Sequence, residues 1–294
     1  MSKHHLVPQF YLKNFKIPTS RSAVYIYYRG LGKDPEWRNT STVAYRNNFY
    51  NFTNNNGTIN KGLEPAFSVI ESDVRPIIEE IISNELLPTD SESRYALTFF
   101  IATLLTRNTA YRNKLKTQQQ AIMSTMLKHF PGIDKRKEFK GLFIEPNEDE
   151  LLSHALSSAL NVAPVIGEKN FYLLKSEEGR FVTSDNPVTI HHSSHKHSEI
   201  FGPGGVLEST LSLPLSPNYC LMMDHRSVTE SVKVAEDTLI DEINWLTAIY
   251  AENNLFSDTK TDEIDKLFKN THYGYGQAVE VSFAGETTIY KPEK

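Results

Sequence analysis

Hydrophobic and polar positions follow different patterns in three regions of the chain. The first sixty residues are rich in β-branched and aromatic side chains, and residues 22–28 (SAVYIYY) predict a strand. A second, weaker strand is predicted over 43–52. Residues 54–57 (NNNG) predict a loop, because Asn and Gly tolerate positive φ. We therefore expect a β-rich N-terminal unit over 1–60.

From residue 62 the hydrophobic period becomes that of a helix. Apolar side chains recur at steps of three and four over 66–82. Pro76 lies inside this run and predicts a kink, or an end of the first half at Arg75. Residues 62–161 are predicted to form a helical region.

A long helix is predicted after this one, over 91–128. Asp90 or Ser91 is its expected cap, and its length predicts a break near residues 112–116. A third helix is predicted over 147–161, because its first turn is acidic and carboxylates stabilise the N-terminal end of a helix.

Beyond Pro164 the pattern returns to strands. Residues 170–175 and 179–183 flank a short turn that ends in Gly, which predicts a hairpin. A helix is predicted over 229–251. Further strands are predicted over 188–192, 207–215, 219–224 and 277–290.

The order of strands, then helices, then strands favours an α+β fold over alternating βαβ units. We expect an antiparallel or mixed sheet packed against a central helical region, with a strand-rich region over 165–294. No repeat or low-complexity linker interrupts the sequence. The whole chain, 1–294, is therefore expected to form one composite domain.

The composition is typical of a globular protein with a core. The chain has 294 residues, of which 39% are hydrophobic, and a formal net charge of -5. No run reaches the roughly 20 apolar residues that a membrane span needs, and the first residues lack a secretory apolar core. The single cysteine, Cys220, excludes an intramolecular disulfide framework and favours a reducing, cytoplasmic location.

Charge is distributed unevenly along the chain. Residues 1–50 carry eight Lys and Arg against two acidic residues, and residues 103–140 carry nine against two, whereas 225–269 is acidic. Two basic segments that fold side by side can attract the phosphates of a nucleotide or nucleic acid. The alternative is that these segments are ordinary solvated helix faces and loops.

The N-terminal segment 3–15 (KHHLVPQFYLKNF) carries the first candidates for chemistry. His4 and His5 point to opposite sides of an extended chain, so at most one of them faces a given pocket. A fixed imidazole can act as a general base or a metal ligand, and Gln9 and Tyr11 can bind a substrate through hydrogen bonds. The alternative is a docked N-terminal arm whose histidines bond to the backbone.

Arg107 projects from a largely apolar face of its predicted helix. A charge on such a face needs a partner, either a buried carboxylate or an anionic ligand, and the planar guanidinium suits phosphate. Arg112, on the same predicted helix, is a candidate substrate-binding residue. A structural ion pair of Arg107 with Glu71 or Asp185 is the alternative.

Residues 181–188 (FVTSDNPV) end a strand in small polar residues. Asp185 at such a strand end is a candidate catalytic or metal-binding carboxylate, with Asn186 and the distant Asn244 as candidate substrate-binding residues. The alternative is that these side chains build the turn by bonding to nearby backbone.

Four histidines occur within residues 191–197, a density that permits metal capture, adventitious or functional. The sequence contains no P-loop, His-Glu-x-x-His, nucleophile-elbow or dinucleotide-binding motif. Cys220 lies in an apolar strand and is predicted to be buried. No established motif therefore assigns a reaction.

Six segments together resemble a known family. In chain order they are HHLVPQFYLKNF, LEPAFSVIESDVRPII, RNTAYR (107–112), FVTSDNPV, LPLSPNYCLMM and INWLTAIYAENNLFSD, the last taken as a helix. They resemble the bacterial domain-of-unknown-function family 4238 over nearly the whole chain. That family usually has proline where this sequence has Thr109. Its motif residues match His5, Pro8, Gln9, Tyr11, Glu71, Arg107, Asp185, Asn186, Pro187 and Asn244.

The resemblance implies a bacterial cytoplasmic protein, of a kind often encoded among mobile or defence-associated genes, and no established activity. It also favours a shared pocket of His5, Arg107 and Asp185. The first hypothesis is a hydrolase of nucleic acid or a nucleotide: Arg107 holds a phosphate, His5 is the general base or acid, and Asp185 orients the histidine or binds a divalent metal ion.

Two other hypotheses remain open. One is a non-catalytic sensor or binding module for an anionic ligand or a phage or host protein. The other is that the polar residues form one buried network that stabilises the fold.

Overall fold

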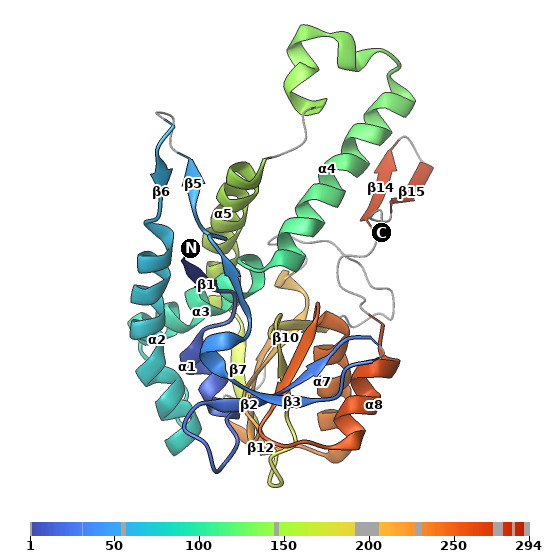
Figure 1. Cartoon of the computed structure of the whole chain (residues 1–294). Coiled ribbons are helices and arrows are strands. Elements are labelled where there is room, and N and C mark those ends of the chain that lie inside the picture. The colour runs from blue at the N-terminus through green and yellow to red at the C-terminus, as the bar shows by residue number, and fades with distance from the viewer. Residues whose placement is uncertain are drawn as a thin grey trace.

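The structure is a computed structural model. It describes residues 2–30, 32–53, 57–143, 147–191, 206–226, 231–272, 279–283 and 286–290. Figure 1 shows a body of sheets and helices from which one long helix rises. Among the residues described, no helix combines the length and the apolar character needed to cross a lipid bilayer.

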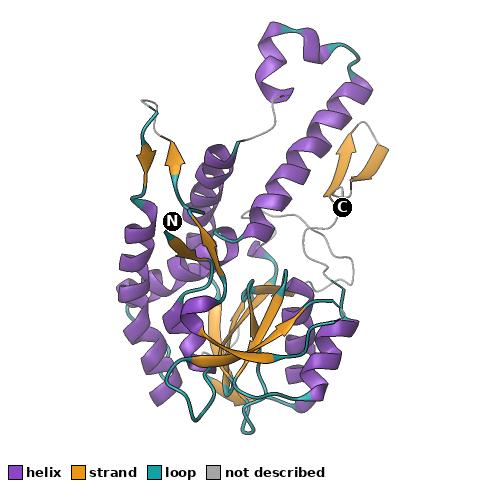
Figure 2. Ribbon diagram, viewed as in Figure 1, coloured by secondary structure: helices purple, strands orange, loops and turns teal. Residues whose placement is uncertain are grey.

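Two sheets lie at the centre of the body (Figure 2). The first consists of β7 (Asn170–Lys175), β9 (Thr189–His191), β10 (Thr210–Ser216), β11 (Tyr219–Asp224) and β12 (Val232–Val234). Its strand order is β12-β7-β11-β10-β9, antiparallel except for the parallel pair of β12 and β7.

The second sheet is antiparallel and consists of β2 (Ala23–Tyr28), β3 (Glu36–Asn39), β8 (Thr183–Ser184) and β13 (Asn254–Ser257). Its order is β3-β2-β13-β8. Short antiparallel pairs are formed by β1 (Lys3–His5) with β4 (Tyr45–Asn47), β5 (Phe52–Thr53) with β6 (Ile59–Asn60), and β14 (Val279–Phe283) with β15 (Glu286–Tyr290).

Helices pack around these sheets. The described α-helices include α1 (Gln9–Leu12), α2 (Leu63–Asn84), α3 (Ser91–Thr106), α4 (Thr109–His129), α5 (Glu148–Gly167), α7 (Asp237–Tyr250) and α8 (Asp262–Asn270). Short 3-10 helices are η1 (Lys13–Phe15), η2 (Thr40–Thr42), η3 (Ile133–Lys135) and η4 (Lys137–Phe143). This combination of helices with antiparallel and mixed sheets confirms the predicted α+β fold class.

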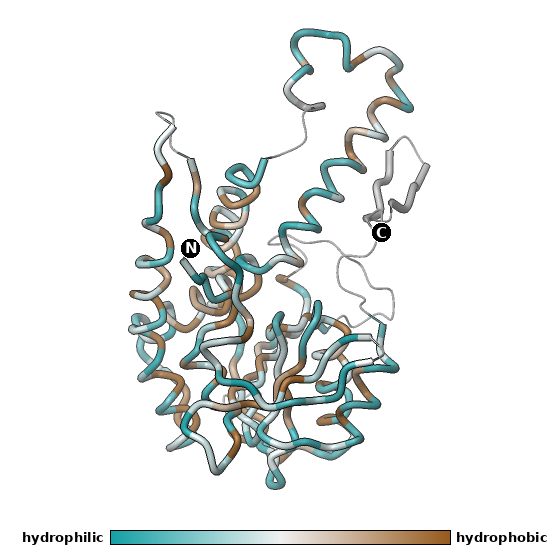
Figure 3. The backbone as a smooth tube through the Cα atoms, viewed as in Figure 1, coloured by the Kyte–Doolittle hydropathy of each residue, from teal (hydrophilic) through white to brown (hydrophobic). Residues whose placement is uncertain are grey.

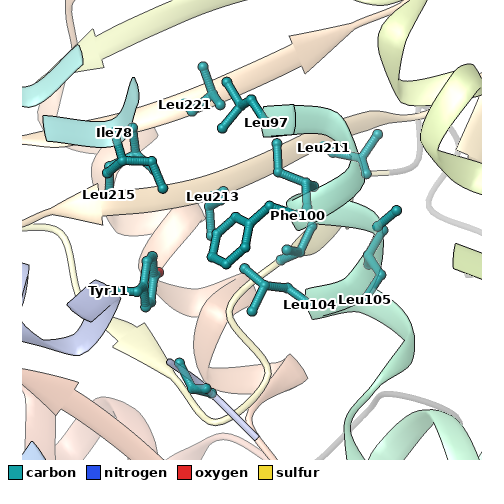
Figure 4. Packing of buried hydrophobic residues seen from close by; sticks show 14 of the residues in the cluster. Tyr11, Ile78, Leu97, Phe100, Leu104, Leu105, Leu211, Leu213, Leu215 and Leu221 are labelled. Carbon is teal, nitrogen blue, oxygen red and sulfur yellow. The ribbon is translucent and has the colours of Figure 1, made fainter. Parts of the chain in front are cut away.

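The hydrophobic core joins α3 to one face of the first sheet. Phe100 of α3 is fully buried beside Leu213 of β10 (Figure 4). Alternate residues of the same sheet point the other way, where Cys220 of β11 is buried with Ile243 of α7, and this confirms the predicted burial of Cys220. The apolar stretches in Figure 3 follow these helix and sheet contacts.

Pro76 does not end its helix at Arg75. α2 runs from Leu63 to Asn84 with Pro76 inside it. The proline is exposed, whereas Val74 and Ile78 on either side of it are fully buried. A proline inside a helix costs about 3 kcal/mol, and burying two aliphatic side chains contributes about as much or more. The core therefore keeps the helix continuous.

The long predicted helix breaks at residues 107–108, earlier than expected. Asn108 caps α4, since its Oδ1 accepts a hydrogen bond from the Tyr111 N–H, and Asp90 caps α3 as predicted. Thr109 is the first residue of α4. The proline that the resembling family has there is tolerated at that position, because the first N–H of a helix needs no partner within it.

The predicted hairpin of 170–175 with 179–183 is wrong. Its turn exists, with Gly179 at φ +66 and its N–H donating to the Ser176 carbonyl. However, β7 pairs with β11, and β8 belongs to the second sheet, where it pairs with β13. The residues that form a turn are neighbours in the sequence and can be recognised there. The strand that pairs with β7 lies more than forty positions away, so the local sequence does not indicate it.

Other element boundaries also move. Strands exist where 22–28, 188–192, 207–215 and 219–224 predicted them, but 43–52 is divided between β4 and β5. Within the predicted strand 277–290, the described residues form two strands, β14 and β15, that pair antiparallel. The helix predicted over 229–251 begins at Asp237, because residues 232–234 pair with β7 as β12, and residues 254–257 form β13. α5 continues past 161 to Gly167, and α8 was not predicted.

Replacing Phe100 by alanine should lower the free energy of unfolding by about 3–5 kcal/mol, because the ring is fully buried and its removal leaves a cavity. Tyr95→Ala on the same helix is the matched control, since Tyr95 is 57% exposed, and its cost should stay below about 1 kcal/mol. Denaturant titration of the three proteins measures both changes. Equal losses would contradict this account of the core.

Candidate functional site

The N-terminal segment is held extended by the pairing of β1 with β4. In this pair His4 lies opposite Arg46, and His5 lies opposite Tyr45. Successive side chains of a strand point to opposite faces. His4 is accordingly buried, and His5 is only half-buried. The two imidazoles therefore have different surroundings.

His4 is part of the protein interior. Its Nδ1 accepts a hydrogen bond from the Tyr50 N–H at 2.8 Å, and its ring stacks on that of Tyr50. Burial lowers the pKa of His4. A protonated Nδ1 could not accept this bond, so the structure requires neutral His4. His4 is not among the residues that line the cavity beside His5.

His5 borders a cavity of about 290 Å³ beside α2. Gln9 from the N-terminal arm and Glu64, Glu71 and Arg75 from α2 line the same cavity. Gln9 thus lies where a substrate-binding residue was expected. The N-terminal arm and one face of α2 form this site together.

One imidazole nitrogen of His5 has no partner. Burial lowers the pKa of His5, the charges of Lys3 and Arg107 add to this, and a hydrogen bond to the Ser41 backbone opposes it. Nε2 is buried and has no hydrogen-bond partner.

Arg107 is 3% exposed and does not itself line this cavity, but it pairs with Glu71, which does. Its Nε donates to the Leu6 carbonyl at 3.1 Å, and its Nη1 pairs with Glu71 Oε1 at 3.0 Å. The guanidinium lies over the Phe67 ring. Nη2 is buried without a hydrogen-bond partner. The predicted alternative to ligand binding, an ion pair with Glu71, is therefore present. The N–H groups of Nη2 have no acceptor.

Sequence reasoning missed Glu64 and Tyr50. Glu64, Glu71 and Arg75 recur at seven and eleven residues along the amphipathic helix α2, and this charged stripe is a signal that could have indicated a site. Tyr50 is fully buried, and its hydroxyl lies 3.2 Å from the His5 carbonyl and 3.5 Å from the Arg107 carbonyl. No local pattern marks Tyr50.

Asp185 lies apart from the His5 cavity. Its carboxylate accepts hydrogen bonds of 2.7–3.0 Å from the N–H groups of Glu252, Asn253 and Asn254, at the start of β13. Burial raises the pKa of Asp185 to about 7, and these donors offset it only in part. Asp185 is not among the residues that line the cavity. The structure therefore does not bring it together with His5 and Arg107, because backbone donors of β13 occupy its oxygens.

Tyr11 and Asn186 are also engaged within the protein. The Tyr11 hydroxyl donates to the Pro214 carbonyl and lies 2.7 Å from Thr183 Oγ1. Asn186 accepts from Asn108 Nδ2 and donates to the Tyr250 carbonyl. These bonds connect β8 to α1, α4 and α7. Both residues thus hold elements together and do not border the cavity.

The remaining candidates lie elsewhere. Arg112 is buried, pairs with Glu148 and donates to the Phe49 carbonyl. Asn244 of α7 bonds both ways with the backbone of Arg180 and Val182, and it borders a different cavity of about 260 Å³.

His191 is within bonding distance of Ser212, whereas His192, His195 and His197 lie outside the described residues. Within the described part of the chain, no group of three His, Cys, Asp or Glu side chains is arranged to hold a metal ion.

Comparison with known proteins identifies the family of this chain. Residues 3–261 match the family model described as Protein of unknown function (DUF4238). The chain belongs to this family. The resemblance carried by the six sequence segments is therefore confirmed, and the match spans His5, Arg107 and Asp185 alike. No curated protein and no solved structure matches this DUF4238 protein.

Asp185→Ala should lower the free energy of unfolding by about 2–4 kcal/mol, because backbone donors of β13 lose their acceptor. The exposed Asp73 on α2 supplies the control, and Asp73→Ala should change stability by less than about 1 kcal/mol. Denaturant titration measures both. A loss of activity in Asp185→Ala with unchanged stability would instead assign Asp185 to the site.

Acid should destabilise the protein through His4. Its pKa in the folded protein is below 6.5, so the unfolded chain binds a proton first, and stability falls as pH drops from about 6.5 through the folded-state value. His4→Gln keeps an acceptor that does not titrate, and should reduce the fall between pH 7 and 5. The raised pKa of Asp185 acts in the opposite sense but is common to both proteins. Unfolding curves at several pH values compare the slopes, and identical slopes would contradict neutral His4.

Proposed function

We propose that this DUF4238 protein hydrolyses a phosphate-bearing ligand, a nucleotide or the end of a nucleic acid, in the His5 cavity. The observation that carries the proposal is the imidazole of His5: its Nε2 has no hydrogen-bond partner, and the side chain borders the cavity. A neutral imidazole with a free lone pair is the form that a general base needs.

Cationic groups beside His5 support an anionic ligand. Arg107 Nη2 is a buried donor without a partner, held in place because Nε and Nη1 are already bonded. A phosphate oxygen that reaches Nη2 would gain a charge-assisted hydrogen bond. Arg75 also borders the cavity, where its Nε pairs with Glu79 at 2.9 Å.

Glu64 is the proposed general acid. Burial, followed by the charge of Glu71, raises its pKa, so its protonated form persists to higher pH than that of an exposed glutamate. In the proposed step His5 Nε2 takes a proton from water, the water oxygen forms the new P–O bond, and the leaving oxygen takes the proton of Glu64. The rate should fall in acid as His5 is protonated and in alkali as Glu64 ionises.

The basic segments support nucleic acid or a nucleotide as the ligand class. They lie side by side where Arg112 of α4 donates to the Phe49 carbonyl and stacks on the Phe49 ring. Burial lowers the pKa of Arg112, and the charge of Arg46 lowers it further. Glu148 compensates part of this charge. A role in bacterial defence is an extension of the proposal that rests on the family resemblance.

A second candidate is a binding module that recognises the same anionic ligand without turnover. The observation in its favour is the Arg107–Glu71 pair, because Glu71 neutralises charge that a transition state would otherwise use. Such a module would gain thermal stability on binding its ligand and would yield no product.

The purified protein should release product from one of a panel of nucleotides, RNA and DNA, assayed with and without Mg²⁺ or Mn²⁺ across pH 5–9. His5→Ala should reduce the rate by about 10²–10⁴-fold, the usual contribution of a general base. His154→Ala is the matched control, because His154 is an exposed histidine on α5. Glu64→Gln should remove the decline on the alkaline side of the profile.

Equal rates for His5→Ala and the unaltered protein would overturn the hydrolase. Ligand-induced stabilisation that is lost in Arg107→Gln, without product from any substrate, would establish the binding module instead. The melting temperature of each variant separates these outcomes from misfolding.

A further inference from the structure

An open groove runs between α2 and α3, with a volume of about 850 Å³. Apolar side chains form much of its surface, and Leu86 and Tyr95 are 58% and 57% exposed there. Tyr95 stacks on Phe99, one turn further along α3. The other apolar residues that line this α2–α3 groove are Ile70, Pro76, Ile77, Leu87, Pro88 and Ala96.

The charged side chains that line the groove are all acidic. Its lining residues, all within the described chain, include four carboxylates and no lysine, arginine or histidine; the carboxylates are Asp73, Glu80, Asp90 and Glu92. An occupant must therefore combine apolar side chains for the floor with positive charge for the edges. This is the chemistry of a basic amphipathic helix.

Such a helix exists in this chain. The end of α4 and the 3-10 helices after it, residues 120–143, form what we call the α4 arm. Ile122 and Met126 lie four residues apart, with Met123 and Leu127 beside them, so these side chains share one helix face, and Phe130 follows at the C-cap of α4. Ile122 is 53%, Leu127 40% and Phe130 49% exposed. This arm face therefore presents exposed apolar side chains.

The arm is also basic. Residues 128–140 carry five Lys and Arg against two acidic residues. Figure 1 shows the arm rising away from the body, with α2 along the opposite side, and Figure 3 shows apolar positions continuing along it. The arm of one molecule therefore does not lie in the groove of the same molecule.

We propose that the arm face of one copy packs into the α2–α3 groove of a second copy. The lengths agree: residues 122–130 span about 12 Å of helix, and the α2 residues that line the groove, 70–80, span about 15 Å. The arm brings apolar side chains to an apolar floor and Lys and Arg to carboxylates. The contact joins two different surfaces, so it is heterologous and gives a reciprocal dimer or a larger assembly, according to geometry.

The test measures self-association by sedimentation velocity or light scattering. An arm variant, I122E/L127E, places like charge against the groove, and a groove variant, L86E/Y95E, makes the floor polar. The native protein should associate more weakly in high salt, because the charges are exposed. Each variant alone should be monomeric. All four altered side chains are exposed, and melting curves check that each variant remains folded.

Mixing the two variants tests whether the arm face of one copy binds the groove of another. The arm variant keeps an intact groove, and the groove variant keeps an intact arm, so an equimolar mixture should form a 1:1 heterodimer. Val69→Glu, an exposed apolar position of α2 that does not line the groove, should leave association unchanged. A monomeric native protein at 100 µM (about the concentration where weak contacts form), variants that still associate, or a folded mixture that stays monomeric would each overturn the proposal.

Discussion

The buried charge of Arg107 is the constraint on which the N-terminal half of the structure depends. A guanidinium that is 3% exposed needs compensation, and it draws this from the Leu6 carbonyl of the N-terminal arm and from Glu71 of α2. Tyr50 adds a hydroxyl between the carbonyls of His5 and Arg107. Arg107, at the end of α3, therefore positions the N-terminal arm and α2 relative to each other. The residues that line the His5 cavity come from these two segments.

This constraint separates two kinds of polar residue. His4, Tyr11, Asp185 and Asn186 form hydrogen bonds within the protein itself, and these bonds connect segments that are distant in the chain. By contrast, His5 Nε2 and Arg107 Nη2 are buried without partners. Buried polar atoms nearly always have partners in folded proteins, so two unpartnered nitrogens beside one cavity are where a ligand is expected. The proposed chemistry rests on the second group.

The surface of the molecule is organised by helix faces rather than by single side chains. Packing of α2 and α3 against the first sheet leaves their outer faces to form an acidic groove with an apolar floor. The α4 arm carries the complementary combination. Ser72 borders both the groove and the His5 cavity, so a copy seated in the groove would lie next to the proposed active site. The groove for association and the cavity for ligand binding would then share Ser72 as a lining residue.

The sequence by itself determined the α+β class, the strands at 22–28 and 219–224, the cap of α3 and the opposed directions of His4 and His5, because these depend on local periodicity and backbone geometry. It also singled out Arg107 and named Glu71 as an alternative partner. Only the tertiary structure decided that Pro76 stays inside a helix, that β7 pairs with β11, and that Asp185 bonds to β13 instead of joining His5. Each of these outcomes is set by burial and hydrogen bonds between residues distant in the chain, and a local pattern carries no information about which distant partner offers them.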